Sequence, residues 1–335
     1  MSKRAVLCYI SRMQSFWNKL PKPFFVLAPM EDVTDAAFRR LIARYGKPDV
    51  MFTEFTSADG LVLAPEDGKK KLLKKLIFSE SERPIVAQLF SAVPERMEAA
   101  ARLVAELGFD GIDINMGCPD RAVEKSGCGA ALIKNPALAR ELIRAAKLAG
   151  LPVSVKTRIG YNTDELDTWL PELLAEEPAV VTIHARTRKE MSDVPAHWDA
   201  VKRGVEIRNE SGSKTLIVGN GDVKDIPDAR AKAAEAGCEG VMLGSAIYGN
   251  PWLFMDVGHP YIPTPQERER ALLEHLSLFD ELLGGTTNYA TMKKHFKAYI
   301  SGWEGAKELR TRLMESENVA EANAILGTFR AHTPS

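Results

Sequence analysis

A cysteine stands on a tight turn in the stretch DINMGCPDRAVEKSGCGAAL, which covers residues 113–132. The stretch starts as an apolar strand, breaks at Gly117-Cys118-Pro119 and ends in small residues. Pro119 restricts the backbone of Cys118 and helps to fix the direction of the thiol. A free thiol has a pKa of about 8.5, so Cys118 could give up a proton close to neutral pH. A small buried side chain, the commonest fate of a free cysteine, is the structural alternative.

Polar residues or glycines follow several other apolar runs in the same way. They are Pro29-Met30-Glu31, Gln88, Asn115, Lys156 with Arg158, His184 with Arg186, Asn220-Gly221-Asp222 and Gly244-Ser245. Taken singly, each has a structural interpretation, such as a glutamine that satisfies loop amides. Because the strands of a parallel barrel end at one catalytic mouth, so many polar ends favour a shared site. The glycines after the last two runs suit a phosphate held by backbone N–H groups.

Short apolar runs that alternate with helical patterns must position these residues. We predict strands at 24–28, 50–54, 84–89, 111–115, 152–156, 179–184, 215–220 and 240–244. Between them lie amphipathic segments such as 94–108, where apolar residues recur at helical spacing. Eight strands interleaved with helices indicate a parallel sheet covered on both faces. A (β/α)8 barrel over 24–255 fits this pattern, whereas an open doubly wound sheet usually has a GxGxxG turn that LAPMEDVTDAAF lacks.

The pattern changes from residue 260 onward. Thr264-Pro265-Gln266-Glu267 predicts the capped start of a helix that ends at Gly284-Gly285. Two more helical stretches follow, at 288–302 and 305–316, and no strand-like run remains. We therefore predict a small all-helical C-terminal domain over 260–335, and we treat 1–23 as an N-terminal extension.

The excess of positive charge is concentrated in this helical segment. Between Thr286 and Arg312, six Lys/Arg residues stand against two Glu residues, a net charge of +4 in a chain whose total is −1. Four aromatic residues, Tyr289, Phe296, Tyr299 and Trp303, are interleaved with them. A basic face with aromatic residues is typical of nucleic-acid binding, although charge runs are more often solvated faces.

The composition limits the other classes of function. The chain is 45% hydrophobic and 27% charged, as in ordinary soluble proteins, and no apolar run is long enough to cross a bilayer. Four cysteines occur without a CxxC pair, and six histidines are dispersed without metal-ligand spacing. We therefore expect a cytoplasmic protein, a monomer, with no metal and no membrane partner. We expect Cys8, Cys128 and Cys238 to be small buried side chains, with exposure as the alternative for Cys128 because it lies in a GCG stretch.

Taken together, the motifs resemble those of the tRNA-dihydrouridine synthases. The segments LAPMEDVTDAAFRR, QLFSAVPERM, DINMGCP, GCGAALIKNP, SVKTRIG, TIHARTR, VGNGD and GVMLGSAIYGNPWLF follow the family order, and KKHFKAYISGWEGAKELRTRL resembles the family's C-terminal helical domain. The resemblance runs from about Phe24 to Leu313 and is most specific at NMGCP. It implies a (β/α)8 barrel that holds FMN, uses NADPH as electron donor and acts on uridines in tRNA.

The resemblance also assigns roles to residues. It implies flavin contacts at Pro29, Met30, Glu31, Gln88, Lys156, His184, Asn220, Gly221, Asp222, Gly244 and Ser245. The family's catalytic cysteine falls on Cys118, Asn115 is similar to the residue that holds the uracil ring, and Arg186 is a further candidate for binding substrate. One departure is Ser245, because the family commonly has arginine there. Serine loses the bidentate grip on phosphate, which Arg158 or another side chain would have to replace.

The implied reaction explains why these residue types are needed. Reduction of the uracil C5–C6 double bond takes a hydride at C6, which only a cofactor supplies, and a proton at C5, which Cys118 would donate from the opposite face. A cation, Lys156, would stabilise the reduced flavin. The uridine must leave its stack, so the tRNA backbone needs anchors elsewhere. Candidates are Lys293, Lys294, Lys297, Lys307, Arg310 and Arg312, with a second basic run at 68–76.

Three alternatives remain open at this point. An FMN barrel that reduces a free pyrimidine, such as a dihydroorotate-type oxidoreductase, would share the fold but would not need the basic helical domain. A lyase or aldolase barrel would use Lys156 as a Schiff-base nucleophile. A non-catalytic RNA-binding protein on the same barrel would bind tRNA without reducing it. The sequence does not reveal which uridine is modified.

Overall fold

The computed structural model describes residues 15–255 and 258–332. A single parallel sheet forms the larger domain, and each strand predicted from the sequence is present within one or two residues at its ends. The strands are β1 (Phe24–Leu27), β2 (Met51–Phe52), β3 (Thr56–Ser57), β4 (Ile85–Phe90), β5 (Gly111–Met116), β6 (Val153–Arg158), β7 (Val180–His184), β8 (Leu216–Asn220) and β9 (Gly240–Leu243). The short strand β3, which continues the pairing of β2 with β4, was not predicted.

The sheet closes on itself. Its order is β1-β9-β8-β7-β6-β5-β4-β2, and a parallel bridge from Val26 of β1 to Val50, next to β2, joins the two ends. The expectation of a (β/α)8 barrel is confirmed, and the open doubly wound sheet is wrong. A closed parallel sheet has no free edge, and all its strands end at the same mouth.

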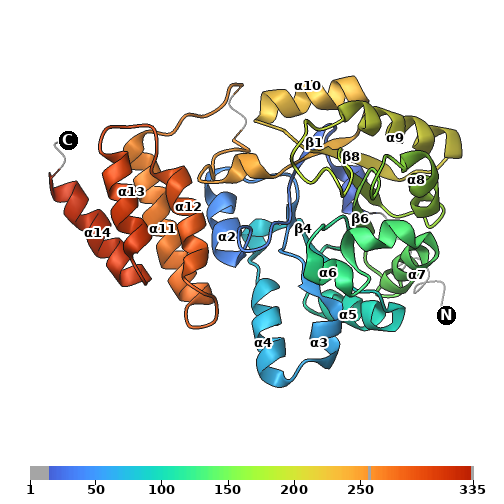
Figure 1. The fold of residues 1–335 in the computed structure, drawn as a ribbon, viewed down its shortest axis with the longest axis horizontal. Helices are drawn as coiled ribbons and strands as arrows, with labels where there is room; N and C mark the ends of the chain where they lie inside the picture. The colour runs from blue at the N-terminus through green and yellow to red at the C-terminus, as the bar shows by residue number, and fades with distance from the viewer. Residues whose placement is uncertain (1–14, 256–257, 333–335) are drawn as a thin grey trace.

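Helices follow the strands around the outside of the barrel (Figure 1). They are α2 (Ala36–Tyr45), α3 (Ala58–Leu63), α4 (Glu66–Lys75), α5 (Pro94–Glu106), α6 (Arg121–Lys125), α7 (Pro136–Lys147), α8 (Leu166–Leu174), α9 (Trp198–Ser211) and α10 (Ile226–Ala236). The hairpin of α3 and α4 projects away from the barrel (Figure 1). No helix within the two described segments combines the length and the apolar content that a membrane span needs.

The interior of the barrel is apolar toward the amino ends of its strands. Phe24, Phe52, Val180 and Leu216 lie there with at most 5% of their surface exposed. Trp17, in a short 3-10 helix over Phe16–Lys19, is 1% exposed and packs against Phe24 and Phe52 at ring-centroid distances of 5.6 and 6.2 Å. The part of the predicted extension that the structure describes therefore closes the floor of the barrel, while residues 1–14 lie outside the described chain.

Four helices form the C-terminal domain: α11 (Pro265–Leu283), α12 (Ala290–Tyr299), α13 (Ala306–Glu315) and α14 (Val319–His332). The predicted capping box at the start of α11 is confirmed, because Thr264 Oγ1 accepts from the Glu267 N–H and Glu267 Oε2 accepts from the Thr264 N–H at 2.7 Å. We had not predicted α14. Phe296 and Tyr299, expected on a nucleic-acid-binding face, are fully buried and form part of the core.

The helical domain packs on the barrel through α2 (Figure 1). Phe38 of α2 lies against His275 of α11 and His295 of α12, with ring centroids 4.9 and 4.6 Å apart. Burial lowers the pKa of His295 to about 3 and that of His275 well below its ordinary value, so both rings are neutral. At the rim of this contact, Lys294 forms an ion pair with Asp32 at 2.9 Å.

The first prediction concerns the floor of the barrel. Replacement of Trp17 by alanine should lower the free energy of unfolding by about 3–5 kcal/mol, because it removes a fully buried aromatic ring and leaves a cavity. Ile262→Ala, at a side chain that is 81% exposed, is the control and should change it by less than about 0.5 kcal/mol. Denaturant unfolding followed by far-UV circular dichroism measures both. Equal stability of the two variants would contradict the role of Trp17.

Candidate active site

The strand register brings the predicted polar residues together at the carboxyl ends of the strands. Asn115 of β5 lies beside Lys156 of β6, Arg158 of β6 lies beside His184 of β7, and His184 lies beside Asn220 of β8. Because side chains alternate along a strand, these residues continue the inward-facing rows whose amino-terminal members form the apolar interior. The barrel is thus apolar at its floor and polar at its mouth.

The turn that carries Cys118 follows β5 and is held by Asn115. The Asn115 Oδ1 accepts hydrogen bonds from the N–H groups of Cys118 at 2.9 Å and Gly117 at 3.2 Å. The Cys118 carbonyl in turn accepts from the Ala130 N–H at 3.0 Å. Cys118 is partly exposed as a residue, and burial raises the pKa of its thiol above the ordinary value. Cys118 is therefore protonated at neutral pH and is placed as a proton donor rather than as a thiolate.

Buried charge surrounds this turn. Lys156 lies in the row beside Asn115, and burial, with the neighbouring Arg158 cation, lowers its pKa to about 8. Asp113, one inward position below Asn115, is fully buried, and burial raises its pKa to about 6. The two groups attract each other, since Asp113 raises the pKa of Lys156 and Lys156 lowers that of Asp113. At neutral pH the site thus combines an ionised carboxylate with an ammonium poised to lose its proton.

Arg186 and Asp222, predicted to contact substrate and flavin, bind each other. The Arg186 guanidinium donates to the Asp222 carboxylate and to the Val194 carbonyl, and its side chain is buried. Asp222 also accepts from the Ala196 N–H at 2.8 Å. These contacts tie the loop after β7 to the loop after β8, so both residues organise the mouth of the barrel.

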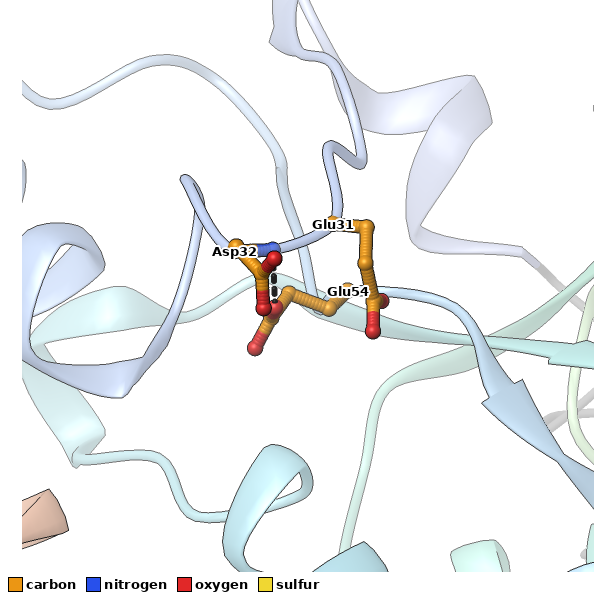
Figure 2. A group of neighbouring side chains, drawn as sticks. All are labelled: Glu31, Asp32 and Glu54. Carbon is orange, nitrogen blue, oxygen red and sulfur yellow. Dashed lines mark hydrogen bonds between the residues drawn. The ribbon is translucent and has the colours of Figure 1, made fainter. Parts of the chain in front are cut away.

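Three carboxylates meet beside the mouth, although the sequence has no metal-ligand spacing. Figure 2 shows Glu31 and Asp32, on the loop after β1, close to Glu54, which follows β2. One oxygen from each lies within 4.8 Å of the others, and the Asp32 N–H donates to Glu54 Oε1 at 2.7 Å. Lys75 of α4 pairs with Glu31, and Lys294 pairs with Asp32. Two lysines thus offset the charge, and the cluster is an ion-pair network.

The predicted RNA-contacting lysines differ in their availability. Lys297 is exposed and Lys293 is half-buried on α12, whereas Lys294 is committed to its ion pair with Asp32. The second basic run forms α4, where Lys70, Lys71 and Lys74 line a hollow of about 610 Å³ that also includes Thr286 of the helical domain. The positive charge of this hollow therefore comes from α4, where it is partly offset by Asp67, and the helical domain contributes the uncharged Thr286.

Comparison with known proteins decides the family. Residues 26–332 match the model of the dihydrouridine synthase (Dus) family. The chain belongs to this family. Two curated relatives agree: a probable tRNA-dihydrouridine synthase of Staphylococcus aureus (strain COL) is 42% identical over 95% of this chain and 96% of its own length, and probable tRNA-dihydrouridine synthase 2 of Bacillus subtilis (strain 168) is 43% identical over 94% and 97%.

Solved structures support the fold of this Dus-family chain. A 2-naphthoyl-CoA reductase matches with a TM-score of 0.53 at 12% identity, over 70% of this chain and 49% of that one. Histamine dehydrogenase from Rhizobium sp. 4-9 matches with a TM-score of 0.52 at 15% identity, over 76% and 48%. The chain thus spans about half the length of these two proteins, and at such low identity the likeness concerns the barrel alone.

The Dus family implies FMN, and several residues at the mouth fit it. Burial and the nearby Lys156, Arg158 and Arg186 cations hold the pKa of His184 well below its ordinary value, so the ring is neutral, and its buried Nδ1 has no partner among the described residues. At Gly244 an added Cβ would meet only ordinary contacts, at 3.6 Å from Ala28 and 3.7 Å from Met30. The space at Gly244 would therefore accept a side chain, although its backbone, at φ −117° and ψ −94°, lies outside the regions that other residues favour. A phosphate could lie against the bare backbone of this glycine.

Other predicted flavin contacts have roles within the chain. Gln88 is fully buried between Asp113 and Asn115, and Asn220 Nδ2 donates to the Met242 carbonyl at 2.8 Å. Ser245 is exposed at the start of a 3-10 helix over Ser245–Ile247. The suggestion that Arg158 replaces the family's arginine at the phosphate is not supported. Its guanidinium donates to the carbonyls of Gly117, Thr187 and Met191 beside the Cys118 turn.

Sequence reasoning missed Asp113, Ser154 and Glu54, although a signal was present. Asp113 and Ser154 stand two positions before Asn115 and Lys156 in predicted strands, which puts them on the same inward face. Two of the remaining cysteines are buried, Cys128 at 2% exposed and Cys238 at 7%. The burial expected of both is therefore confirmed, the alternative that Cys128 is exposed is wrong, and Cys8 lies outside the described residues.

The second prediction concerns the Cys118 thiol. Iodoacetamide labelling of the native protein, quantified for each cysteine by peptide mass spectrometry, should rise with pH with a midpoint above about 8.5, because burial favours the neutral thiol. Cys238, whose pKa is raised to about 11, is the internal control and should label more slowly throughout. A midpoint below neutral pH would mean that Cys118 is a thiolate, which contradicts its assignment as an acid.

Proposed function

We propose that this chain is a tRNA-dihydrouridine synthase, which reduces the C5–C6 double bond of specific tRNA uridines. The observation that carries the proposal is the partly exposed Cys118 at the barrel mouth, whose thiol is protonated and lies within the field of Lys156. Membership of the Dus family and the names of the curated relatives support the substrate.

The residues divide the reaction between the two faces of the base. FMN, when bound, supplies the hydride for C6, which no amino-acid side chain can deliver. Cys118 gives its proton to C5 from the other face, and burial keeps that proton on the sulfur until the reaction. Lys156 would supply positive charge to stabilise the reduced flavin, and Asn115, which shapes the Cys118 turn, would hold the uracil.

The helical domain supports tRNA rather than a free pyrimidine as substrate. A uridine that leaves its stack loses the stabilisation of base stacking. Protein contacts to the tRNA phosphate backbone can offset this cost. Lys293 and Lys297 on α12, with the basic hollow between α4 and the helical domain, are suited to such contacts. A dihydroorotate-type enzyme needs none of them, and the lyase alternative with Lys156 as nucleophile is set aside because of the family.

We also propose NADPH as the electron donor, a monomer as the working form and the cytoplasm as the compartment. The free thiols of the described cysteines support a reducing compartment. One assay tests both tRNA as substrate and NADPH as electron donor. When purified protein is mixed with flavin and unmodified tRNA, the NADPH consumed should be proportional to the dihydrouridine formed.

The third prediction tests the proton donor. Cys118→Ala should lower dihydrouridine formation by at least about 100-fold, because it removes a general acid, while flavin and tRNA binding remain. Cys238→Ala, at a buried thiol away from the mouth, is the matched control and should keep its activity. Liquid chromatography of tRNA nucleosides measures the product. Undiminished activity of Cys118→Ala would contradict the assignment.

The fourth prediction tests the RNA contacts. Lys293→Glu and Lys297→Glu should weaken tRNA binding and lower the slope of log affinity against log salt by about 1 each, the effect of one lost phosphate contact. Lys294→Met is the matched control on the same helix. Because its ammonium pairs with Asp32, the salt slope should stay unchanged and stability should fall by less than about 1 kcal/mol. Filter binding at several salt concentrations separates these outcomes.

A further inference from the structure

A chain of hydrogen bonds with a single direction lies under the Cys118 turn. It starts at the Asp113 carboxylate, toward which every donor of the chain points. This carboxylate accepts one hydrogen bond from Ser154 Oγ and one from Gln88 Nε2, the second at 2.8 Å. Asn115 Nδ2 then donates to Gln88 Oε1 at 2.9 Å. The chain ends where the Cys118 N–H donates to Asn115 Oδ1 at 2.9 Å.

The ionised carboxylate fixes this direction. A carboxylate only accepts hydrogen bonds, so Gln88 must turn its Nε2 toward Asp113 and its Oε1 toward Asn115. Asn115 must then donate with Nδ2, which leaves Oδ1 for the Cys118 amide. If Asp113 could also donate, both carboxamides could reverse, and Asn115 would turn an NH2 group toward the N–H of Cys118. Gln88 and Asp113 are fully buried and Asn115 is 6% exposed, so solvent is poorly placed to replace a lost partner.

We propose that Asp113 is a positioning residue for Cys118, which acts through two carboxamides to hold the turn that carries the thiol. Asp113 has no hydrogen bond to Cys118 within the described chain; Gln88 and Asn115 stand between them. The proposal rests on the proposed function for its catalytic meaning. The geometry of the turn can be measured without that reaction.

The competing explanation is that Asp113 merely satisfies two buried donors. In that case any substitution that fits the space would leave the Cys118 turn unchanged. The proposal instead requires that every donor along the hydrogen-bond chain faces an acceptor. A carboxylate at position 88 or 115 should therefore restore the Cys118 turn that is disturbed when the carboxylate at position 113 is lost. Labelling of Cys118 reports this, because an opened turn exposes the sulfur and relieves the burial that raises the pKa of the thiol.

The experiment compares iodoacetamide labelling of Cys118 in native wild-type protein and four variants. In Asp113→Asn, labelling should be about fivefold faster, the effect of about one lost hydrogen bond. In Asp113→Asn with Gln88→Glu, the new carboxylate accepts from both neighbouring amides, and labelling should return to within about twofold of wild type. In Asp113→Asn with Asn115→Asp, the hydrogen bonds between positions 113, 88 and 115 reverse their direction. The new carboxylate at position 115 still accepts from the Cys118 N–H, so labelling should again return to within about twofold of wild type. Ser154→Ala, which leaves the direction unchanged, is the control.

Slow labelling of Cys238 shows in each variant that the barrel is folded. The proposal is overturned if folded Asp113→Asn labels like wild type, or if neither double variant restores the wild-type rate. Should Asp113→Asn alone fail to fold, the two double variants still decide the question by comparison with wild type. Dihydrouridine formation by the wild-type enzyme is measured in parallel. Its absence would overturn the proposed function and leave the labelling result, and hence the positioning role, intact.

Discussion

Closure of the parallel sheet is the constraint on which the rest of this structure depends. The pairing of β1 with β9 and the bridge from Val26 to Val50 turn a row of strand ends into a ring. One end of that ring is filled by apolar side chains and closed by Trp17. Polar groups at the other end therefore have little water behind them, and they must satisfy one another or a ligand.

The shifted pKa values of the site follow from this arrangement. Burial is the largest cause of the raised pKa values of Cys118 and Asp113 and of the lowered values of Lys156 and His184. Each shift favours the neutral form of the group. The barrel thus keeps an acid protonated and an imidazole neutral at the pH where the enzyme is expected to work, without a dedicated partner for each residue.

The sequence was sufficient for the strands and for most strand-end residues, because alternation of apolar runs and helical segments carries that information. The sequence was not sufficient for predicting which side chains bind one another. Loop paths that no local pattern encodes determine three such contacts: Arg186 with Asp222, Lys294 with Asp32, and Arg158 with the Cys118 turn. Ser245 is exposed, and Arg158, the residue suggested as a substitute for the family's arginine, donates to backbone carbonyls instead.

Two misjudged features did have a local signal. Met292, Phe296 and Tyr299 are spaced as one face of a helix, and the structure buries all three, so periodicity indicated core where composition suggested an RNA-binding face. Asp113 was passed over inside an apolar strand, although its spacing from Asn115 put both on the inward face. A charged residue at an inward position of a barrel strand is therefore a stronger indication of a functional site than the apolar residues around it.

The ion pair between Asp32 and Lys294 has a consequence for how this family can diversify. Asp32 adjoins Glu31, an expected flavin contact, on the loop after β1, while Lys294 belongs to the helical domain next to the buried rings of His275 and His295. The loop after β1 thus faces the expected flavin site with Glu31 and the helical domain with Asp32. In a chimaera that carries a relative's C-terminal helices on this barrel, those helices would need side chains that match Asp32 and α2.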